Sequence, residues 1–393
     1  MDGTVEPSVA GLDAVLQTGF VPCDGPDVVS ELSAQLGDRP FALIALFVSP
    51  QADFAEVMRT AARHWPDVPL TGCTTAGEIS QHQGYTEGGI VAIAFPAERF
   101  GAELLRFDGI PALEDQAVIG DTVRGRSRLK ASSPQFANEF AILLVDGLSL
   151  SEDHLTAALA TGLGPMPMFG GSSGDGTRFK TAPVAFGSEV LHNGAVLAML
   201  RTDCDISVFS LNNFTPTERR MVVTRADPSR RIVHEINAEP AARELGRLLG
   251  KLPDQIDQFT FAANPVVIRF GTRHHVRAIK RVTEDGALEF FSAIDEGVVM
   301  TIAEGAPMTD HLSAQFEDLS RARRPDAVIA FDCILRRIEA EQTQALQALG
   351  EIMCDYKVAG FSTYGEQFGG LHVNQTMTGV AFYAPSTEPT DAG

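Results

Sequence analysis

Residues 357–383 read "KVAGFSTYGEQFGGLHVNQTMTGVAFY", and residues 69–95 read "PLTGCTTAGEISQHQGYTEGGIVAIAF". Each stretch passes from apolar residues through a glycine, a Ser-Thr or Thr-Thr pair and a Gly-Glu pair into a loop and a final apolar segment. A looser copy at 167–200, "PMFGGSSGDGTRFKTAPVAFGSEVLHNGAVLAML", has Gly174-Asp175 where the others have Gly-Glu. Three copies of one sequence pattern predict a repeated structural unit.

A continuous apolar run precedes each copy: "FALIALFVS" from residue 41, "FAILLVDGLS" from 140 and "PDAVIAFDCIL" from 325. Such runs are typical of strands buried on both faces. Between run and copy, apolar residues recur at helical spacing, as in Phe54, Val57, Met58, Ala61 and Trp65, and in Leu335, Ile338, Leu346, Leu349, Ile352 and Met353. We therefore expect a mixed α/β fold of two domains, built from repeated strand, helix, glycine-rich turn and strand units with mixed sheets.

The predicted division between the domains lies near residue 220, where "FTPTERRMVVTRADPSRR" breaks the apolar pattern. After it we expect an amphipathic helix through Ile232, Ile236, Leu245, Leu248 and Leu249, and then a β-rich run in which "EDGAL" forms a hairpin turn. The first ten residues and the tail offer little to bury, which predicts disorder. The expected parts are a partly disordered N-terminal segment, two domains and a disordered tail, at 1–29, 30–220, 221–383 and 384–393.

Charge and composition narrow the possible partners. The 393-residue chain has a net charge of −20, which disfavours nucleic acid and anionic membranes, because binding either requires Lys and Arg. No apolar stretch is long enough to span a membrane, and the N-terminus has no features of a signal peptide, so we expect a cytoplasmic protein. The five cysteines have no metal-like spacing, which indicates reduced thiols. The partner is then a small ligand or a protein.

The glycine-rich turn at 72–78, "GGSSGDG" at 170–176, "FDCILRR" at 331–337 and the block at 360–383 resemble the FIST sensory family, with its FIST N and FIST C domains. The resemblance covers residues 30–383 and implies a ligand-sensing module of signal transduction without enzymatic activity. A subset of the family, the NosP proteins, are haem-binding nitric-oxide sensors that regulate partner histidine kinases and cyclic-di-GMP signalling. The resemblance therefore implies haem b as cofactor, nitric oxide as ligand, and a histidine kinase or diguanylate cyclase as partner.

Haem needs an axial ligand, and the histidines are the candidates. His372 is expected to enter the last strand beside Asn374, in the most polar part of the repeat, and we predict it as the axial ligand. His275 is the second candidate, because in a strand it would share a face with two arginines that could pair with propionates. His274 would share the opposite face with apolar residues, which predicts a core position.

The remaining polar residues of the last repeat are predicted to form the rim of a ligand pocket: Tyr364, Glu366, Asn374 and Gln375, with Phe361 and Phe368 as walls. Glu366 and its counterpart Glu78 either cap backbone N–H groups at the turn or contact a ligand. For Arg336, Asp332 stands four residues earlier as a helical charge partner, and a ligand carboxylate or Glu366 is the alternative partner.

Two other functions are compatible with these residues. A binding module for an amino acid or another small metabolite could use the same glycine-rich turns without haem. A serine hydrolase is the more remote alternative, because Gly170-Gly171-Ser172-Ser173-Gly174 satisfies G-x-S-x-G. That motif requires a helix directly after the serine, and "DGTRFKTAP" shows no helical pattern.

Overall fold

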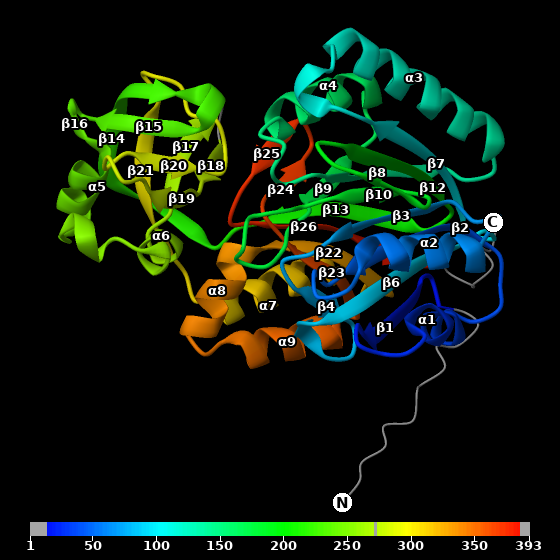
Figure 1. Ribbon diagram of the computed structural model, residues 1–393. Coiled ribbons are helices and arrows are strands. Elements are labelled where there is room, and N and C mark those ends of the chain that lie inside the picture. Colours follow the sequence, from blue (N-terminus) through cyan, green and yellow to red (C-terminus); the bar gives the residue numbers. More distant parts are fainter. Residues whose placement is uncertain (1–13, 271–272, 386–393) are drawn as a thin grey trace, which may run out of the picture.

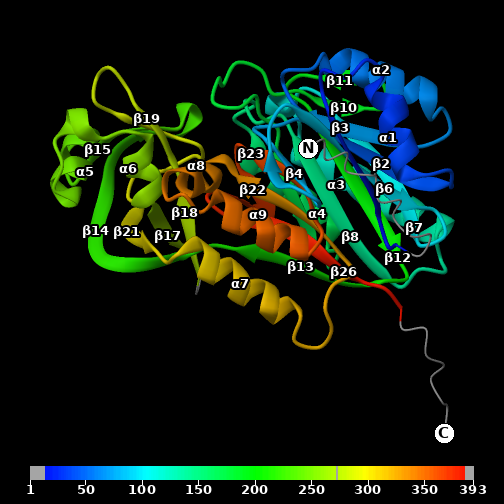
Figure 2. The ribbon, with the colours of Figure 1, turned by 90° about the horizontal axis from the view of Figure 1, so that it is seen from below.

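The computed structural model describes residues 14–270 and 273–385, and it consists of a large body and a smaller lobe (Figure 1). The lobe comprises residues 214–305, and the body comprises the described residues on either side of it. The long strand β14 leads from the body into the lobe (Figure 2). The predicted disorder of the first ten residues, and of the tail from residue 386, lies outside the described residues.

The body contains the repeated unit three times. The first repeat is β1 (Gln17–Pro22), α1 (Val28–Leu36), β2 (Phe41–Val48), α2 (Phe54–His64), β3 (Leu70–Thr74), β4 (Glu78–Ser80), β5 (Gly84–Thr86) and β6 (Gly89–Pro96). The second is β7 (Phe100–Phe107), the 3-10 turn Ile110–Ala112, α3 (Asp115–Ser132), β8 (Asn138–Val145), α4 (Glu152–Leu163), β9 (Met168–Ser172), β10 (Val184–Phe186), β11 (Glu189–Leu191) and β12 (Ala195–Thr202).

The third repeat is interrupted by the lobe after its first strand. It consists of β13 (Asp205–Leu211), α7 (Met308–Leu319), β22 (Ala327–Cys333), α8 (Ile334–Gln342), α9 (Leu346–Asp355), β23 (Val358–Thr363), β24 (Glu366–Phe368), β25 (Leu371–Val373) and β26 (Met377–Tyr383). The helical pattern from Leu335 to Met353 thus belongs to two helices, and between them Gln344 adopts a positive φ of 57°.

The three repeats exchange hairpins in a cycle. Each repeat forms a sheet from its own strands, in which one pair is parallel and the others are antiparallel: β1-β6-β2-β3, β7-β12-β8-β9 and β13-β26-β22-β23. The hairpin β10-β11 of the second repeat then joins the first sheet, β24-β25 joins the second, and β4-β5 joins the third. The predicted mixed α/β fold with mixed sheets is confirmed, and no repeat completes its sheet alone.

The exchanged hairpins pair with the three sheets in the same register. Glu78 pairs with Phe361 of the third sheet, Val184 with Cys73 of the first, and Glu366 with Gly171 of the second. These three places are therefore equivalent. In the second repeat the equivalent residue is Val184, not Asp175, because additional residues separate β9 from β10.

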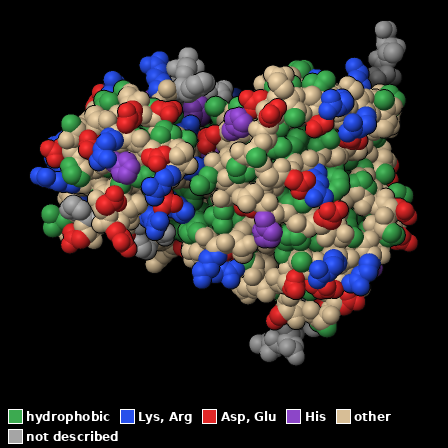
Figure 3. All heavy atoms as spheres, turned by 45° about the horizontal axis from the view of Figure 1, so that its top comes forward, with side chains coloured by type: hydrophobic (Ala, Val, Ile, Leu, Met, Phe, Trp, Pro, Cys, Tyr) green, Lys and Arg blue, Asp and Glu red, His purple; other side chains and the backbone are tan. Residues whose placement is uncertain are grey.

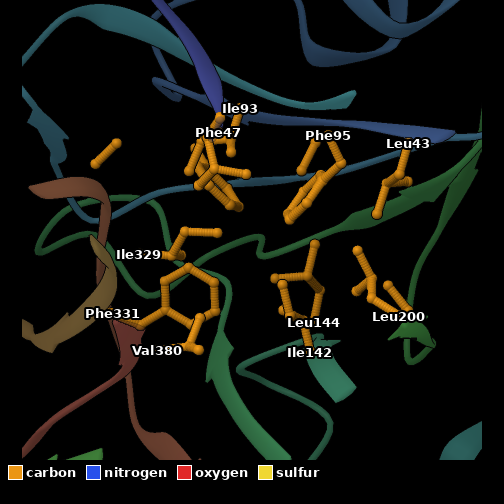
Figure 4. Close-up of a cluster of buried hydrophobic side chains, with 14 of the residues drawn as sticks. Leu43, Phe47, Ile93, Phe95, Ile142, Leu144, Leu200, Ile329, Phe331 and Val380 are labelled. Atoms are coloured by element: carbon orange, nitrogen blue, oxygen red, sulfur yellow. The ribbon is translucent and has the colours of Figure 1, made fainter. Parts of the chain in front are cut away.

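The inner faces of the three sheets share one core. Alternate residues of the central strands point inward, such as Phe47 of β2, Leu144 of β8 and Phe331 of β22 (Figure 4). The residues between them face outward onto helices, which are α1 and α2 on the first sheet, α3 and α4 on the second, and α7 and α9 on the third. Burial of both faces explains the continuous apolar runs.

The lobe is a separate sheet with its own apolar core. Its elements are β14 (Phe214–Asp227), β15 (Ile232–Ile236), β16 (Glu239–Pro240), α5 (Ala241–Leu249), α6 (Gln258–Ala263), β17 (Val266–Phe270), β18 (Arg273–Arg277), β19 (Ile279–Val282), β20 (Leu288–Phe290) and β21 (Val299–Gly305), with 3-10 turns at Pro228–Arg230 and Pro253–Gln255. The order is β18-β17-β21-β14-β15-β20-β19, with β16 beside β15.

Two predictions for the lobe are tested by these elements. The hairpin at "EDGAL" is confirmed, because β19 and β20 pair antiparallel across it. The helix expected from Ile232 is wrong in its first half: residues 232–236 form β15, because two neighbouring strands supply hydrogen bonds there, and the helix begins at Ala241. The predicted domain division near residue 220 falls within β14 and stays a prediction.

Within the described residues, no helix combines the length and the apolar character that crossing a membrane requires. On the face shown in Figure 3, basic and acidic side chains are interspersed.

One glycine in each repeat lies directly against the neighbouring parallel strand. A Cβ atom added to Gly72 would lie 2.6 Å from the carbonyl oxygen of Leu46, and at Gly360 it would lie 1.8 Å from that of Ala330. Gly170 is equivalent, with 2.5 Å to the carbonyl oxygen of Leu143. Close approach of two backbones, and not a left-handed conformation, explains these three glycines.

We expect Gly360→Ala to lower the free energy of unfolding by about 2–3 kcal/mol or more, because the methyl group would overlap a backbone oxygen that cannot move independently of its sheet. Urea denaturation would measure the change. Gly25→Ala is the control, since its added Cβ would find only contacts of 3.5 Å or longer. Equal stability of the two variants would contradict this explanation of the repeated glycine.

Candidate functional site

The three glycine-rich turns meet beyond the carboxyl ends of the parallel strands, where they form a closed ring of backbone hydrogen bonds. The first turn is bonded to the third, the third to the second, and the second to the first. The pairs are Ala76 N to Ser362 O (2.9 Å) and Ser362 N to Gly77 O (2.7 Å), Ser172 N to Gly365 O (2.8 Å) and Tyr364 N to Ser172 O (3.1 Å), and Gly174 N to Thr74 O (3.1 Å) and Gly176 N to Thr75 O (3.3 Å).

The repeated glutamates cap backbone groups beside this ring. Glu78 accepts hydrogen bonds from the Thr75 hydroxyl and from Gly89 N at 3.1 Å. Glu366 accepts from the Thr363 hydroxyl and, at 2.7 and 3.1 Å, from Oγ1 and N of Thr376. Both side chains are fully buried. Both glutamates therefore fit the interpretation that they cap backbone N–H groups at the turn.

Burial changes the protonation of these two carboxyl groups. It raises the pKa of Glu78 to about 7 and that of Glu366 to about 8, while the hydrogen bonds to each carboxylate oppose the change. In the second turn, Asp175 accepts from the backbone N–H groups of Lys180 and Thr181, both at 3.1 Å, and from the Tyr364 hydroxyl. It stabilises a longer loop in the place of the Gly-Glu turn.

A cavity of about 350 Å³ opens beside the first turn. It lies at the carboxyl ends of the parallel strands β2 and β3, where open α/β sheets commonly bind ligands. Three glycines with positive φ lie in its wall, Gly77 (129°), Gly88 (73°) and Gly176 (72°). All three repeats contribute wall residues: Ser49, Pro50, Gln51, Thr75, Ala76, Gly77, Glu78, Glu87 and Gly88; Asp175, Gly176, Thr177 and Arg178; and Ile334, Arg337, Ile338 and Glu341.

Two guanidinium groups and two accessible carboxylates give this cavity its polarity. Arg337 is almost completely buried, and each of its nitrogens has a partner: Glu341 at 3.2 Å, the Thr86 carbonyl at 2.9 Å and Glu87 at 3.0 Å. It lies over Gly77, where any side chain would displace it. Arg178 is half-exposed and donates to the carbonyl oxygens of Asp175 and, at 3.4 Å, Pro50.

The predicted axial ligand, His372, is buried on β25. Its Nδ1 lies 3.1 Å from Nε2 of Gln367, and its ring packs on the backbone of Gly365, where a Cβ atom would come within 2.4 Å of the ring. Burial lowers its pKa, which keeps the imidazole neutral. Its carbonyl oxygen accepts from Arg277 of the lobe at 3.0 Å.

His275 lies on the edge strand β18 and is half-buried. It lines a second cavity of about 70 Å³ together with His274, Phe368, Leu371 and other residues. The prediction that His274 is a core residue is wrong: it is exposed, whereas Val276, two residues further along the same face, is buried in a small cluster with Val267 and Ala303.

The residues of the predicted rim are buried and hold the lobe and the turns in place. Asn374 accepts from the Ser292 hydroxyl at 2.7 Å, and Gln375 donates to the Ala262 carbonyl at 3.1 Å, so both bind the lobe. The Tyr364 hydroxyl contacts the second turn at the Gly176 carbonyl, at 2.8 Å. Phe361 belongs to the central core. A ligand role for these residues stays a prediction.

Arg336 is buried in the body. It donates to Asp332 at 2.7 Å, the partner four residues earlier, and to Asn213 at 2.8 Å. The same aspartate accepts from the Tyr85 hydroxyl. This network joins α8 to the residue that precedes the lobe, and Arg336 does not line the 350 Å³ cavity.

The surroundings of the two histidines do not fit haem in this arrangement. His372 is not a wall residue of either cavity, and its ring is held by Gln367 and Gly365. The cavity at His275 has about 70 Å³, whereas sites for ligands of drug size have roughly 300–1,000 Å³.

Ser172 has the surroundings of a structural residue. It is fully buried at the end of β9, and its hydroxyl accepts from Gln367 at 3.0 Å. Residues 173–183, all of them described, contain no helix. A nucleophile elbow requires an exposed serine followed by a helix.

The polar residues of the sequence draw attention to the last repeat, whereas the 350 Å³ cavity lies at the first. Arg178, Glu87 and Glu341 are not among the residues that the sequence predicts for the site, and Arg337 appears only within the motif "FDCILRR" at 331–337. The Gly-Glu turn at 77–78, equivalent to the one at 365–366, was the available signal. Nothing in the sequence showed that α8 of the third repeat would cover that turn.

The FIST N domain matches residues 42–239, and the FIST C domain matches residues 241–369. This chain belongs to the FIST family. FIST domains are associated with the sensing of small ligands in signal transduction, so the predicted family and its sensory role are confirmed at this level. Comparison with curated proteins gives no match.

We expect Glu366→Gln to change the pH dependence of stability. The pKa of Glu366 is raised in the folded protein, so its proton contributes stability fully below about pH 4.5, and that contribution is lost as the pH rises through about 8. Glutamine stays neutral. Between pH 5 and pH 9, the free energy of unfolding should therefore shift in favour of the variant, relative to the unmodified protein, by on the order of 4 kcal/mol.

Denaturation at a series of pH values would measure this shift. Glu31→Gln is the control, because Glu31 is exposed on α1. Parallel stability profiles for Glu366→Gln and the unmodified protein would show that Glu366 is ionised throughout this range.

Proposed function

We propose that this FIST protein is a signal-transduction sensor that binds a small polar metabolite in the 350 Å³ cavity beside the first turn. The cavity wall is built by all three repeats, and this supports the proposal. The first repeat supplies the turn, the second supplies Arg178, and the third supplies α8. A ligand that contacts all three repeats would stabilise one arrangement of them relative to others. The volume suits a molecule of amino-acid size.

The chemistry of the wall supports a polar ligand. Arg178 is a half-exposed guanidinium that could pair with a carboxylate. Glu87 and Glu341 could accept from an ammonium group, because their carboxylates are partly exposed. The apolar side chains of Ile334 and Ile338 form the other part of the wall. Charged groups at a few positions beside an apolar surface are typical of sites for small metabolites.

The cavity also gives a route from ligand to lobe. Helix α8 lines the cavity through Arg337 and Ile338 and packs against α6 of the lobe. Arg336 of the same helix is bonded to Asn213, next to the start of β14. A ligand that shifts α8 would therefore act on the attachment of the lobe. Coupling of about 1–3 kcal/mol is sufficient for a useful switch.

The identity of the partner follows only from the resemblance to the NosP proteins, and the cytoplasmic location is the expectation drawn from the sequence. A cytoplasmic histidine kinase or a diguanylate cyclase of a cyclic-di-GMP pathway would then read the state of the lobe.

The cavity can be tested by filling it. We expect Thr177→Trp to abolish ligand-induced stabilisation, because Thr177 is an exposed wall residue whose replacement would occupy the space without disturbing a buried contact. A thermal-shift screen of amino acids and small carboxylates would first identify a compound that raises the melting temperature, as binding to the folded state requires.

Thr161→Trp, at an exposed position on α4, is the matched control and should keep the response. The proposed function is overturned if no compound of the screen stabilises the protein, or if Thr177→Trp responds as the control does.

Haem is tested by the visible spectrum. We expect protein reconstituted with haem b to show no stoichiometric Soret band that shifts on addition of nitric oxide, because His372 is held by Gln367 and Gly365. A shifting band would establish the nitric-oxide sensor instead. Loss of that band in His372→Ala, and not in His275→Ala, would then identify the axial ligand.

A further inference from the structure

The cavity wall carries more acidic than basic side chains, and its net charge indicates which class of ligand it favours. Four carboxyl groups lie in the wall, those of Glu78, Glu87, Asp175 and Glu341, whereas Arg178 and Arg337 are its two cationic residues. The difference leaves the wall with a net negative charge of one when Glu78 is protonated and two when it is ionised. A net negative wall favours a cationic group on the ligand.

The accessibility of these groups separates the ones that could bind a ligand from the ones that hold the structure. Glu78 and Asp175 are buried and accept hydrogen bonds from the protein. The side chain of Arg337 is 5% exposed, and each of its nitrogens has a protein partner. The charged groups of these three residues are therefore already paired with other groups of the protein.

The remaining charged groups are accessible. The exposed fractions of the side chains are 66% for Glu87, 46% for Glu341 and 53% for Arg178. Each glutamate bonds Arg337 through one oxygen, at 3.0 and 3.2 Å, so the second oxygen of each is available for a ligand donor. The accessible set thus contains two carboxylates and one guanidinium.

From this set we infer that the cavity takes a basic amino acid, a ligand with one carboxylate and two cationic groups. The carboxylate pairs with Arg178, and the cationic groups pair with Glu87 and Glu341. The aliphatic part of such a side chain lies against Ile334 and Ile338. This inference rests on the proposed function and narrows it to one class of ligand.

The decisive comparison uses L-lysine and L-norleucine, which have side chains of the same length with and without the terminal ammonium. Titration calorimetry on the full chain should give a Kd for lysine at least about tenfold lower than that for norleucine, because a hydrogen bond to a charged group contributes roughly 1.5–3 kcal/mol. L-glutamate should bind more weakly than norleucine. Equal affinity for lysine and norleucine, or a preference for glutamate, would overturn the inference.

Substitution of the two glutamates tests the same inference by changing the protein instead of the ligand. In Glu87→Gln/Glu341→Gln the accessible carboxylates are lost and Arg337 loses both anionic partners, so the preference should change from lysine to glutamate. Glu218→Gln, at an exposed position of the lobe, is the control and should keep the preference for lysine. A double variant that still prefers lysine would show that the ammonium group is bound elsewhere.

The outcome is distinguishable from failure of the proposed function. If norleucine or glutamate binds as well as lysine and Thr177→Trp abolishes that binding, the cavity is a ligand site and only the class is wrong. If none of the three amino acids binds and the wider screen finds no stabilising compound, both proposals fail.

Discussion

The closed ring of backbone hydrogen bonds among the three glycine-rich turns is the constraint on which the rest of the body depends. Each turn is bonded to both others, as at Ala76 with Ser362 and Gly174 with Thr74, so no repeat can reach its final shape without its neighbours. The exchanged hairpins extend the same dependence to the sheets, because each sheet is completed by strands of another repeat. The ring also fixes where the ends of the parallel strands meet.

The cavity is a consequence of that meeting point. At the first turn, small residues and left-handed glycines leave space, and α8 of the third repeat closes one side. At the third turn the equivalent places are occupied: Asn374 stands where the first repeat has Glu87, and Gln375 where it has Gly88, and both are bonded to the lobe. The positive φ is retained at both Gly88 and Gln375. Equivalent backbones thus support an open cavity in one repeat and a domain contact in another.

Several features of the fold followed from local sequence. The buried runs beginning at residues 41, 140 and 325 predicted the central strands β2, β8 and β22, because strands covered on both faces must be apolar throughout. The repeated Gly-Glu turns predicted equivalent strand ends. The helix expected at Ile232 failed because tertiary pairing with β14 and β20 overrode the local pattern. The cavity proposed as the ligand site lies beside the same kind of turn as the predicted pocket rim, but in a different repeat.

The sequence by itself determined that this is a mixed α/β protein with three copies of one unit, since periodicity, buried runs and turn glycines are properties of neighbouring residues. Only the tertiary structure decided which turn carries the 350 Å³ cavity and which polar residues face it. Arg337 and Glu87 are 250 positions apart in the chain and lie 3.0 Å apart in space. The polar residues at 364–375, prominent in the sequence, are instead buried by the lobe and the second turn. Their burial depends on which hairpin joins which sheet, and that exchange is a long-range property that no local pattern encodes.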